Sequence, residues 1–176
     1  MKQILVAGFG GQGILFAGKF LAYIGMIQDK EVSWLPSYGP EMRGGTANCR
    51  VLIPEEAVGS PIVSSPEVLI CMNLPSLDKF EAAIVKRGKA FIDSSLIERK
   101  LNRADVEGYY LPATLLADQH ELKGLANMIM VGKAIKETNL CDMDTLRKAV
   151  EKIVPASKPQ LVELNMKAIE IGYNYQ

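Results

Sequence analysis

The feature that most constrains this chain is a short apolar run that ends in a cluster of glycines and continues into an apolar helix. Residues 3–7 (QILVA) predict a buried strand, residues 8–13 read GFGGQG, and residues 14–24 predict a helix. Lys19 is the only charge on that helix, so we expect more than one of its sides to be covered. This order of elements is typical of an α/β domain with an anion-binding turn.

The rest of the chain alternates between strand and helix patterns, which predicts an α/β fold with a mainly parallel central sheet. Residues 46–53 alternate polar and apolar side chains, which indicates a half-solvated antiparallel strand and a small additional antiparallel layer. No repeat or linker interrupts the pattern, so we expect residues 1–176 to form a single domain. The other expected strands cover 31–35, 68–72, 90–92 and 108–111, and the other expected helices 75–87, 142–153, 125–136 and 159–171.

Charge and cysteine content exclude several classes of function. Twenty basic residues balance twenty acidic ones, so we expect neither nucleic acid nor an anionic membrane as a partner. No stretch approaches the roughly 18 apolar residues of a membrane span, and the first apolar run is too short for a signal peptide, so we expect a cytoplasmic protein. Cys49, Cys71 and Cys141 lie far apart and form no C-x-x-C motif, which predicts reduced thiols and no metal site on this chain.

The glycine cluster matches G-x-G-x-x-G, a pattern that lets a backbone approach a phosphate at a helix N-terminus. A dinucleotide site also requires an acidic residue at the end of the second strand, about 20 residues on, where this chain has WLPS. Three interpretations stay open: NAD or FAD binding, binding of another phosphate or carboxylate group, and glycines that only pack a strand against a helix. The candidate anion-binding residues are Gly8, Gly10, Gly11, Gln12 and Gly13.

Two motifs together indicate a family. GFGGQGI after the first strand, followed by SYGPEMRGG and the TANCRV strand, resembles the gamma subunit, or gamma domain, of 2-oxoacid:ferredoxin oxidoreductases. The resemblance extends through NMIMVG at residues 127–132 to the final helix. It implies an α/β domain with an additional antiparallel layer. The family includes enzymes for pyruvate, 2-oxoglutarate, branched-chain 2-oxoacids and indolepyruvate, and the overall likeness favours 2-oxoglutarate or another 2-oxoacid over pyruvate.

The resemblance also implies a reaction and a set of partners. A 2-oxoacid and coenzyme A would become acyl-CoA and carbon dioxide, with two electrons passed to ferredoxin. Thiamine diphosphate with magnesium and iron–sulfur clusters would belong to other subunits, so we expect no cofactor on this chain alone. The implied partners are alpha and beta subunits and a small ferredoxin-like subunit.

The loop at residues 36–45 holds the second group of candidate residues. Its glycines and prolines could aim a hydroxyl, a carboxylate and a guanidinium at one place, and arginine binds carboxylate or phosphate bidentately. Alternatively, Glu41 and Arg43 pair with each other or with a partner subunit. The candidates for an active-site or interface loop are Ser37, Tyr38, Glu41 and Arg43.

Weaker candidates lie on the strands. Asn48 and Arg50 share one strand face, where the pattern favours an interface or solvent over a ligand. Asn73 and Asp93 each follow or end an expected parallel strand, the position at which α/β proteins bind ligands, but Asp93 also suits a helix cap. The functional hypothesis is a gamma subunit that supports assembly and the active-site region. A stand-alone Rossmann-like NAD(P)-binding oxidoreductase and a structural interaction module are the alternatives.

Overall fold

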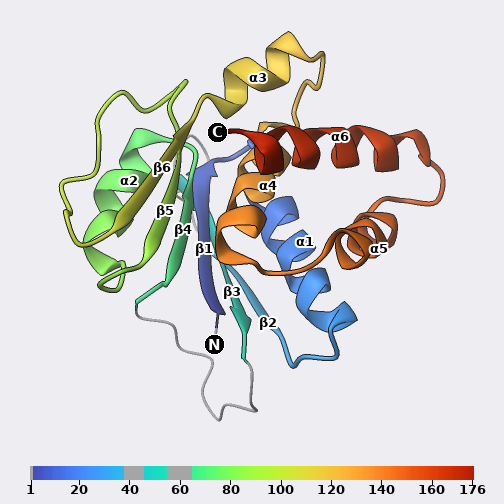
Figure 1. The fold of residues 1–176 in the computed structure, drawn as a ribbon, viewed down its shortest axis with the longest axis horizontal. Helices are drawn as coiled ribbons and strands as arrows, with labels where there is room; N and C mark the ends of the chain where they lie inside the picture. The colour runs from blue at the N-terminus through green and yellow to red at the C-terminus, as the bar shows by residue number, and fades with distance from the viewer. Residues whose placement is uncertain (1, 38–45, 55–64) are drawn as a thin grey trace.

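The computed structural model describes residues 2–37, 46–54 and 65–176 (Figure 1). Tyr38, Glu41 and Arg43 lie outside the described residues. Strands and helices follow one another along the chain as the sequence pattern predicts. The strands are β1 (Lys2–Phe9), β2 (Ser33–Ser37), β3 (Thr46–Ile53), β4 (Val68–Cys71), β5 (Lys89–Asp93) and β6 (Glu107–Leu111). The helices are α1 (Ile14–Ile27), α2 (Leu74–Phe80), the 3-10 turn η2 (Glu81–Ala83), α3 (Ala113–Gln119), α4 (Ala126–Thr138), α5 (Met143–Ile153) and α6 (Gln160–Asn174).

The strands form one six-stranded sheet in the order β2-β3-β1-β4-β5-β6. β1, β4, β5 and β6 pair in parallel, whereas β3 is antiparallel to both β1 and β2. The predicted α/β fold with a mainly parallel sheet is therefore confirmed. The antiparallel part continues the edge of this sheet, because β3 bonds directly to β1 over the whole length of both strands.

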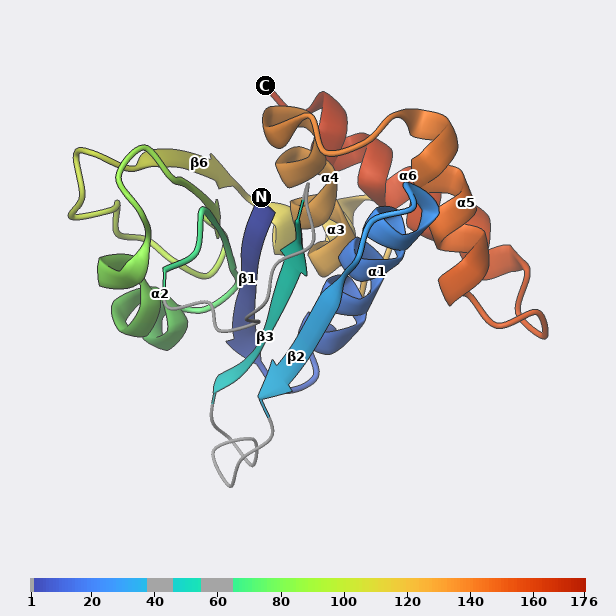
Figure 2. The same cartoon turned by 90° about the horizontal axis from the view of Figure 1, so that it is seen from below.

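Helices cover both faces of the sheet (Figure 2). Alternate β1 side chains face opposite cores: Ile4 and Val6 pack with α1, α4, α5 and α6, whereas Leu5 and Ala7 pack with α2. The helix that follows β1 therefore covers one face of the sheet, and the helix that follows β4 covers the opposite face. The crevice between these two strands is a topological switch point, where open α/β sheets bind ligands.

The prediction that β3 is half-solvated is wrong. Its apolar face packs against α1, and on its other face Asn48 is only 8% and Leu52 only 6% exposed. Thr46 and Arg50 on the same face are partly exposed, so this face is mostly buried rather than half-solvated.

Two helices differ from expectation. The helix expected at 75–87 ends at Phe80 and η2, and Arg103 binds the carbonyl oxygens of Glu81, Ala82 and Ile84 at 3.1–3.3 Å. α3 was not expected. Its first turn is held by the carboxylate of Asp93, which accepts hydrogen bonds from the backbone and hydroxyl of Thr114, a cap supplied from 21 residues away.

Glycines let α4 and α6 touch backbone to backbone. A Cβ at Gly132 would overlap the carbonyl group of Ile169, and a Cβ at Gly172 would overlap that of Ile129. Neither neighbour is a flexible side chain tip, so the helices would have to separate to admit even a methyl group.

We expect Gly132→Ala and Gly172→Ala each to lower the free energy of unfolding by about 1–3 kcal/mol, the usual cost of overpacking a close contact. Denaturant unfolding measures this. The matched control is Glu170→Ala, at an exposed site on α6. Its free energy of unfolding should stay within about 0.5 kcal/mol of wild type. Equal effects at the three positions would contradict the close contact.

A buried lysine ties the end of α6 to α4. The ammonium group of Lys133, only 9% exposed as a residue, donates to the carbonyl oxygen of Tyr175 at 2.8 Å and to Glu137 Oε1 at 2.8 Å. Lys133 holds the pKa of the Glu137 carboxyl below its ordinary value of 4.5. This lysine therefore fixes the C-terminal residues and stabilises a carboxylate at once.

Lys133→Met should lower the free energy of unfolding at pH 7 by about 1–3 kcal/mol, because charged hydrogen bonds are lost. Because the folded-state pKa of Glu137 is depressed, its contribution is present above pH 4.5 and disappears as pH falls through the folded-state value. The difference between wild type and variant should therefore shrink in acid, as measured by unfolding at several pH values. A constant difference would show that Glu137 is not involved.

Candidate functional site

The glycine turn lies at the carboxyl end of β1 and begins α1. Gly11 has φ 90° and Gly13 has φ 72°, a left-handed conformation that side chains with a Cβ rarely adopt. Gly10 is exposed and is not among the glycines with positive φ. The turn therefore depends on Gly11 and Gly13 for its conformation, whereas Gly10 is an exposed position without that requirement.

Side chains from two directions hold this turn. Gln12 Oε1 accepts a hydrogen bond from the Phe9 backbone at 2.6 Å, and Gln12 Nε2 donates to the Met72 carbonyl oxygen at 3.0 Å. From α4, Asn127 Nδ2 donates to the Gly13 carbonyl oxygen at 3.0 Å across 114 residues of sequence. The turn is thus fixed before any ligand arrives.

Gly8 has a packing role. A Cβ there would lie 2.5 Å from Gln12 Oε1 and 2.7 Å from Ile14 Cδ1. The first glycine therefore makes room for the side chain that shapes the turn, so packing and binding are compatible interpretations of the same motif.

The N-terminus of α1 is left open. Gly13 is its N-cap and provides no side-chain hydrogen bond, and its first turn contains no acidic residue. The first backbone N–H groups of a helix have no acceptor within the helix and carry about half a unit of positive charge. An anion placed there would be stabilised by these groups.

A hollow of about 200 Å³ adjoins the turn. Residues that follow β1, β4 and β5 line it together with α3 and the start of α4; they include Gly11, Gln12, Met72, Leu96 and Thr114. The hollow is smaller than the roughly 300–1,000 Å³ of ordinary small-molecule pockets. Asp118, also in its lining, makes it unfavourable for a large polyanion.

The sheet order argues against a dinucleotide. A Rossmann-type site uses an acidic residue at the end of a strand next to β1, so that it reaches the ribose. Here antiparallel β3 separates β2 from β1, and β2 ends at Ser37. The position that would contact the ribose is therefore displaced by one strand and lacks a carboxylate.

Asn73 and Asp93 reach the expected edge of the sheet but have structural roles. Asn73 Oδ1 accepts from the Ser76 backbone at 2.9 Å and caps α2. Asp93 is fully buried and its carboxylate is shared between Ser95 and Thr114. Both side chains are thus used as caps, while the buried Asn73 Nδ2 has no hydrogen-bond partner among the described residues.

Of the loop candidates, Ser37 alone lies among the described residues. Ser37 pairs with Asn48 across β2 and β3, and Arg50 lies two positions further along the same face of β3. Thr46 pairs with Phe9 next to the glycine turn. Ser37 and Thr46, which flank residues 38–45, thus lie at the same carboxyl edge as the turn.

The structure adds residues that sequence reasoning missed. Asn127 is one, and its signal was an amide within the apolar segment NMIMVG. The others are exposed apolar side chains, each after a different parallel strand at this carboxyl edge. They are Phe9 (42% exposed), Leu74 (41%), Leu96 (44%) and Leu115 (50%). Because apolar residues are normally assigned to the core, only the structure identifies them as a surface feature, which we call the apolar rim.

The described residues provide little for redox or metal chemistry. Burial raises the pKa of the Cys49, Cys71 and Cys141 thiols to about 12, so they are protonated near neutral pH. In residues 2–37, 46–54 and 65–176, no group of three or more His, Cys, Asp or Glu side chains could hold a metal ion. None of the helices in this part of the chain has the length and hydropathy to cross a membrane.

Comparison with known proteins places the chain among oxidoreductases. The family described as pyruvate ferredoxin/flavodoxin oxidoreductase matches residues 3–175. The 2-oxoglutarate synthase subunit KorC of Methanocaldococcus jannaschii is 34% identical over 175 residues, covering 98% of this chain and 92% of that protein. The ketoisovalerate oxidoreductase subunit VorA of Methanothermobacter thermautotrophicus is 37% identical over 172 residues, or 97% of this chain, but this chain spans only 35% of its length.

A solved structure shares the fold. The gamma subunit of a keto/oxoacid ferredoxin oxidoreductase from Geobacter sulfurreducens superposes with a TM-score of 0.81 at 27% identity, covering 98% of this chain and 96% of that one. Matches of this extent, together with the glycine turn and the mixed sheet, confirm the resemblance read from the two motifs. The chain belongs to the pyruvate ferredoxin/flavodoxin oxidoreductase family and is a gamma subunit of the 2-oxoacid:ferredoxin oxidoreductase type.

Proposed function

We propose that this chain is the gamma subunit of a cytoplasmic complex that oxidises a 2-oxoacid with coenzyme A to acyl-CoA and carbon dioxide and passes the electrons to ferredoxin. Family membership over residues 3–175 is the observation that supports this. The partners are alpha and beta subunits and a ferredoxin-like subunit. Thiamine diphosphate with magnesium and iron–sulfur clusters would supply the carbanion and electron chemistry on those partners.

The cysteines of this chain, all of which lie among the described residues, do not fit an iron–sulfur cluster. The three thiols are separated and buried or half-buried, with pKa values raised to about 12, whereas an iron–sulfur cluster requires several convergent thiolates. This chain would instead bind an anionic group and position it beside another subunit's active site. Its carboxyl edge combines an open helix N-terminus with the apolar rim, which suits a surface beside another subunit's active site.

The glycine turn would hold an anionic group at this surface. We propose a phosphate or carboxylate group, bound by backbone N–H groups at the start of α1, as the ligand of Gly10, Gly11 and Gly13. The bonds from Gln12 and Asn127 support this, because they fix the turn without using those N–H groups. Ser37, Tyr38, Glu41 and Arg43 stay candidates for the adjoining interface.

A pair of glycine variants separates shape from binding. Gly13→Ala should cost at least about 1 kcal/mol of unfolding free energy, since an L-residue is strained at that φ and its Cβ would meet the Asn127 amide. Gly10→Ala, at an exposed position, should stay within about 0.5 kcal/mol yet lower acyl-CoA formation by the assembled complex, because a Cβ blocks close approach of an anion. Unchanged turnover in Gly10→Ala would refute the anion site.

Assembly is tested at the apolar rim. Leu96→Ser should leave the unfolding midpoint of the chain nearly unchanged and reduce its co-purification with alpha and beta subunits. Leu164→Ser is the matched control, since Leu164 is similarly exposed, at 39%, but lies on α6. We also expect Arg43→Ala to reduce co-purification, since a pair between this guanidinium and a carboxylate of a partner subunit would be lost, at about 2–5 kcal/mol of binding if that pair is buried in the interface. If Leu96→Ser and Leu164→Ser assemble equally well, the carboxyl edge is not the interface.

A further inference from the structure

The amino edge of the sheet carries a second hollow, on the side opposite the glycine turn. Its volume is about 420 Å³, within the range of small-molecule sites. The first residues of β1, β4 and β5, the turn at 85–88 and the end of α4 line it. The basic residues among them are Lys2, Lys86, Arg87 and Lys89.

These cations reach the hollow from separate segments of the chain. Lys2, Lys86 and Arg87 form no ion pair with any residue that the structure describes. Lys86 acts electrostatically on the Asp105 carboxylate, whose pKa lies below its ordinary value chiefly because of Arg103. An anion bound among the cations that line the hollow would be attracted by them.

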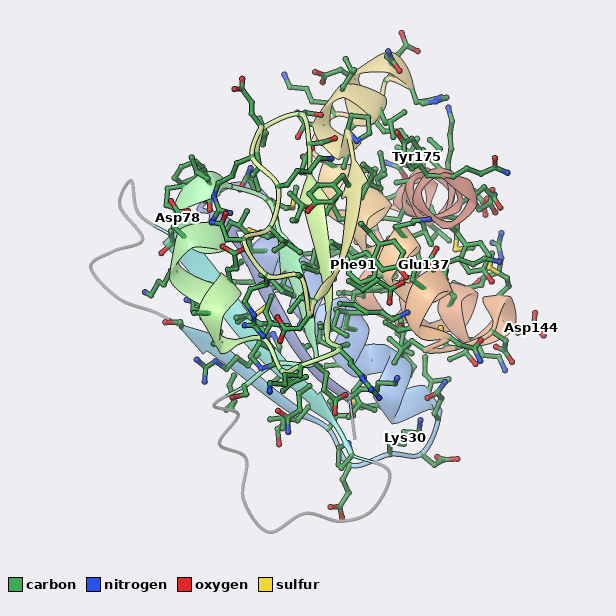
Figure 3. All side chains as sticks on the ribbon, turned by 60° about the vertical axis from the view of Figure 1, so that its left-hand side comes forward. Lys30, Asp78, Phe91, Glu137, Asp144 and Tyr175 are labelled. Carbon is green, nitrogen blue, oxygen red and sulfur yellow. The ribbon has the colours of Figure 1, made fainter. Side chains whose placement is uncertain are left out.

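The fourth cation is fixed in place. Lys89 Nζ donates to the Glu137 carbonyl oxygen at 2.7 Å and to the Tyr109 hydroxyl at 3.3 Å, and Glu107 lies 3.5 Å away. Tyr109 in turn stacks on Phe91, with ring centroids 4.9 Å apart, and Figure 3 labels Phe91 and Glu137 in this region. Lys89 thus presents its charge from a rigid position.

The backbone beside the hollow is strained. Arg87 has φ 62°, a left-handed conformation that is unusual for a residue with a side chain, and its N–H donates to the Asp105 carbonyl oxygen at 2.7 Å. A Cβ on Gly88 would lie 2.9 Å from the Val85 oxygen and 3.0 Å from the Glu67 oxygen. Such strain persists where the surroundings enforce it, often at binding sites.

Acidic neighbours limit the kind of ligand. Glu137 is neutralised by Lys133 at 2.8 Å, which leaves Glu67 as the unpaired carboxylate of the lining. Lys89 is balanced by Glu107, and Lys86 is partly offset by Asp105, so Lys2 and Arg87 exceed the single unpaired carboxylate of Glu67. We propose that this hollow binds a small ligand carrying phosphate groups, with Arg87 as the bidentate donor and Lys2 and Lys86 as point charges. This site does not depend on the function proposed above.

The test uses pyrophosphate as the probe and amide-resolved NMR of the full chain as the readout. Pyrophosphate should shift the amide resonances of residues 86–89 and of Lys2 in a saturable manner. The double variant Lys86→Gln/Arg87→Gln should weaken binding about tenfold, since hydrogen bonds between charged groups are lost. The control Lys123→Gln/Lys158→Gln removes the same charge from exposed sites elsewhere and should bind as wild type.

Three results would overturn the proposal. They are no saturable shift up to about 10 mM pyrophosphate, equal weakening by both double variants, and shifts confined to residues 10–14. Loss of subunit assembly in Lys86→Gln/Arg87→Gln without any pyrophosphate binding would also overturn it, because the hollow would then be a protein interface. The unfolding midpoint of each variant verifies that the fold is retained.

Discussion

The antiparallel pairing of β1 with β3 determines most of what this fold can do. β1 bonds to β3 on one side and to β4 on the other, and its side chains are buried on both faces. Because β3 occupies the position beside β1, β2 moves one strand outward. The glycine turn therefore keeps the helix N-terminus of a Rossmann-type site and loses the neighbouring strand end that would hold a ribose. The same pairing brings Thr46, the first residue of β3, beside Phe9 at the start of the turn.

The turn's shape also depends on the helical layer. Asn127 binds the Gly13 carbonyl from α4, and α4 is positioned by its close contact with α6 through Gly132 and Gly172. A displacement of α6 would thus reach the start of α1 by way of α4. Asn127 Oδ1 is buried without a hydrogen-bond partner in the described structure, so this arrangement carries a cost that packing must offset. A polar residue retained at such a cost fits a role in fixing the turn.

Sequence patterns predicted this fold where the signal is local. Apolar runs and glycines located every strand, and the Asp142 cap located the start of α5. Sequence patterns failed where residues far away in the chain determine the local structure. Asp93 caps α3, and Arg103 binds carbonyl oxygens at the point where α2 ends. The polar face of β3 is mostly buried in the folded chain. At the site, the motif located the turn but not its conformation, since Gly11 and Gly13, rather than Gly10, have positive φ. Asn127 and the apolar rim required the tertiary structure.

The chemistry left exposed at the carboxyl edge favours recognition over catalysis. Two of its described ionisable groups are committed, since Asp93 holds α3 and the Cys71 thiol is protonated with a pKa raised to about 12. What faces outward is backbone N–H at the start of α1 and the side chains of Leu96 and Leu115. Backbone N–H groups bind an anion without transferring a proton, and exposed leucines gain free energy only when another surface covers them. A subunit built in this way would act through what it holds in place, which matches the role proposed above.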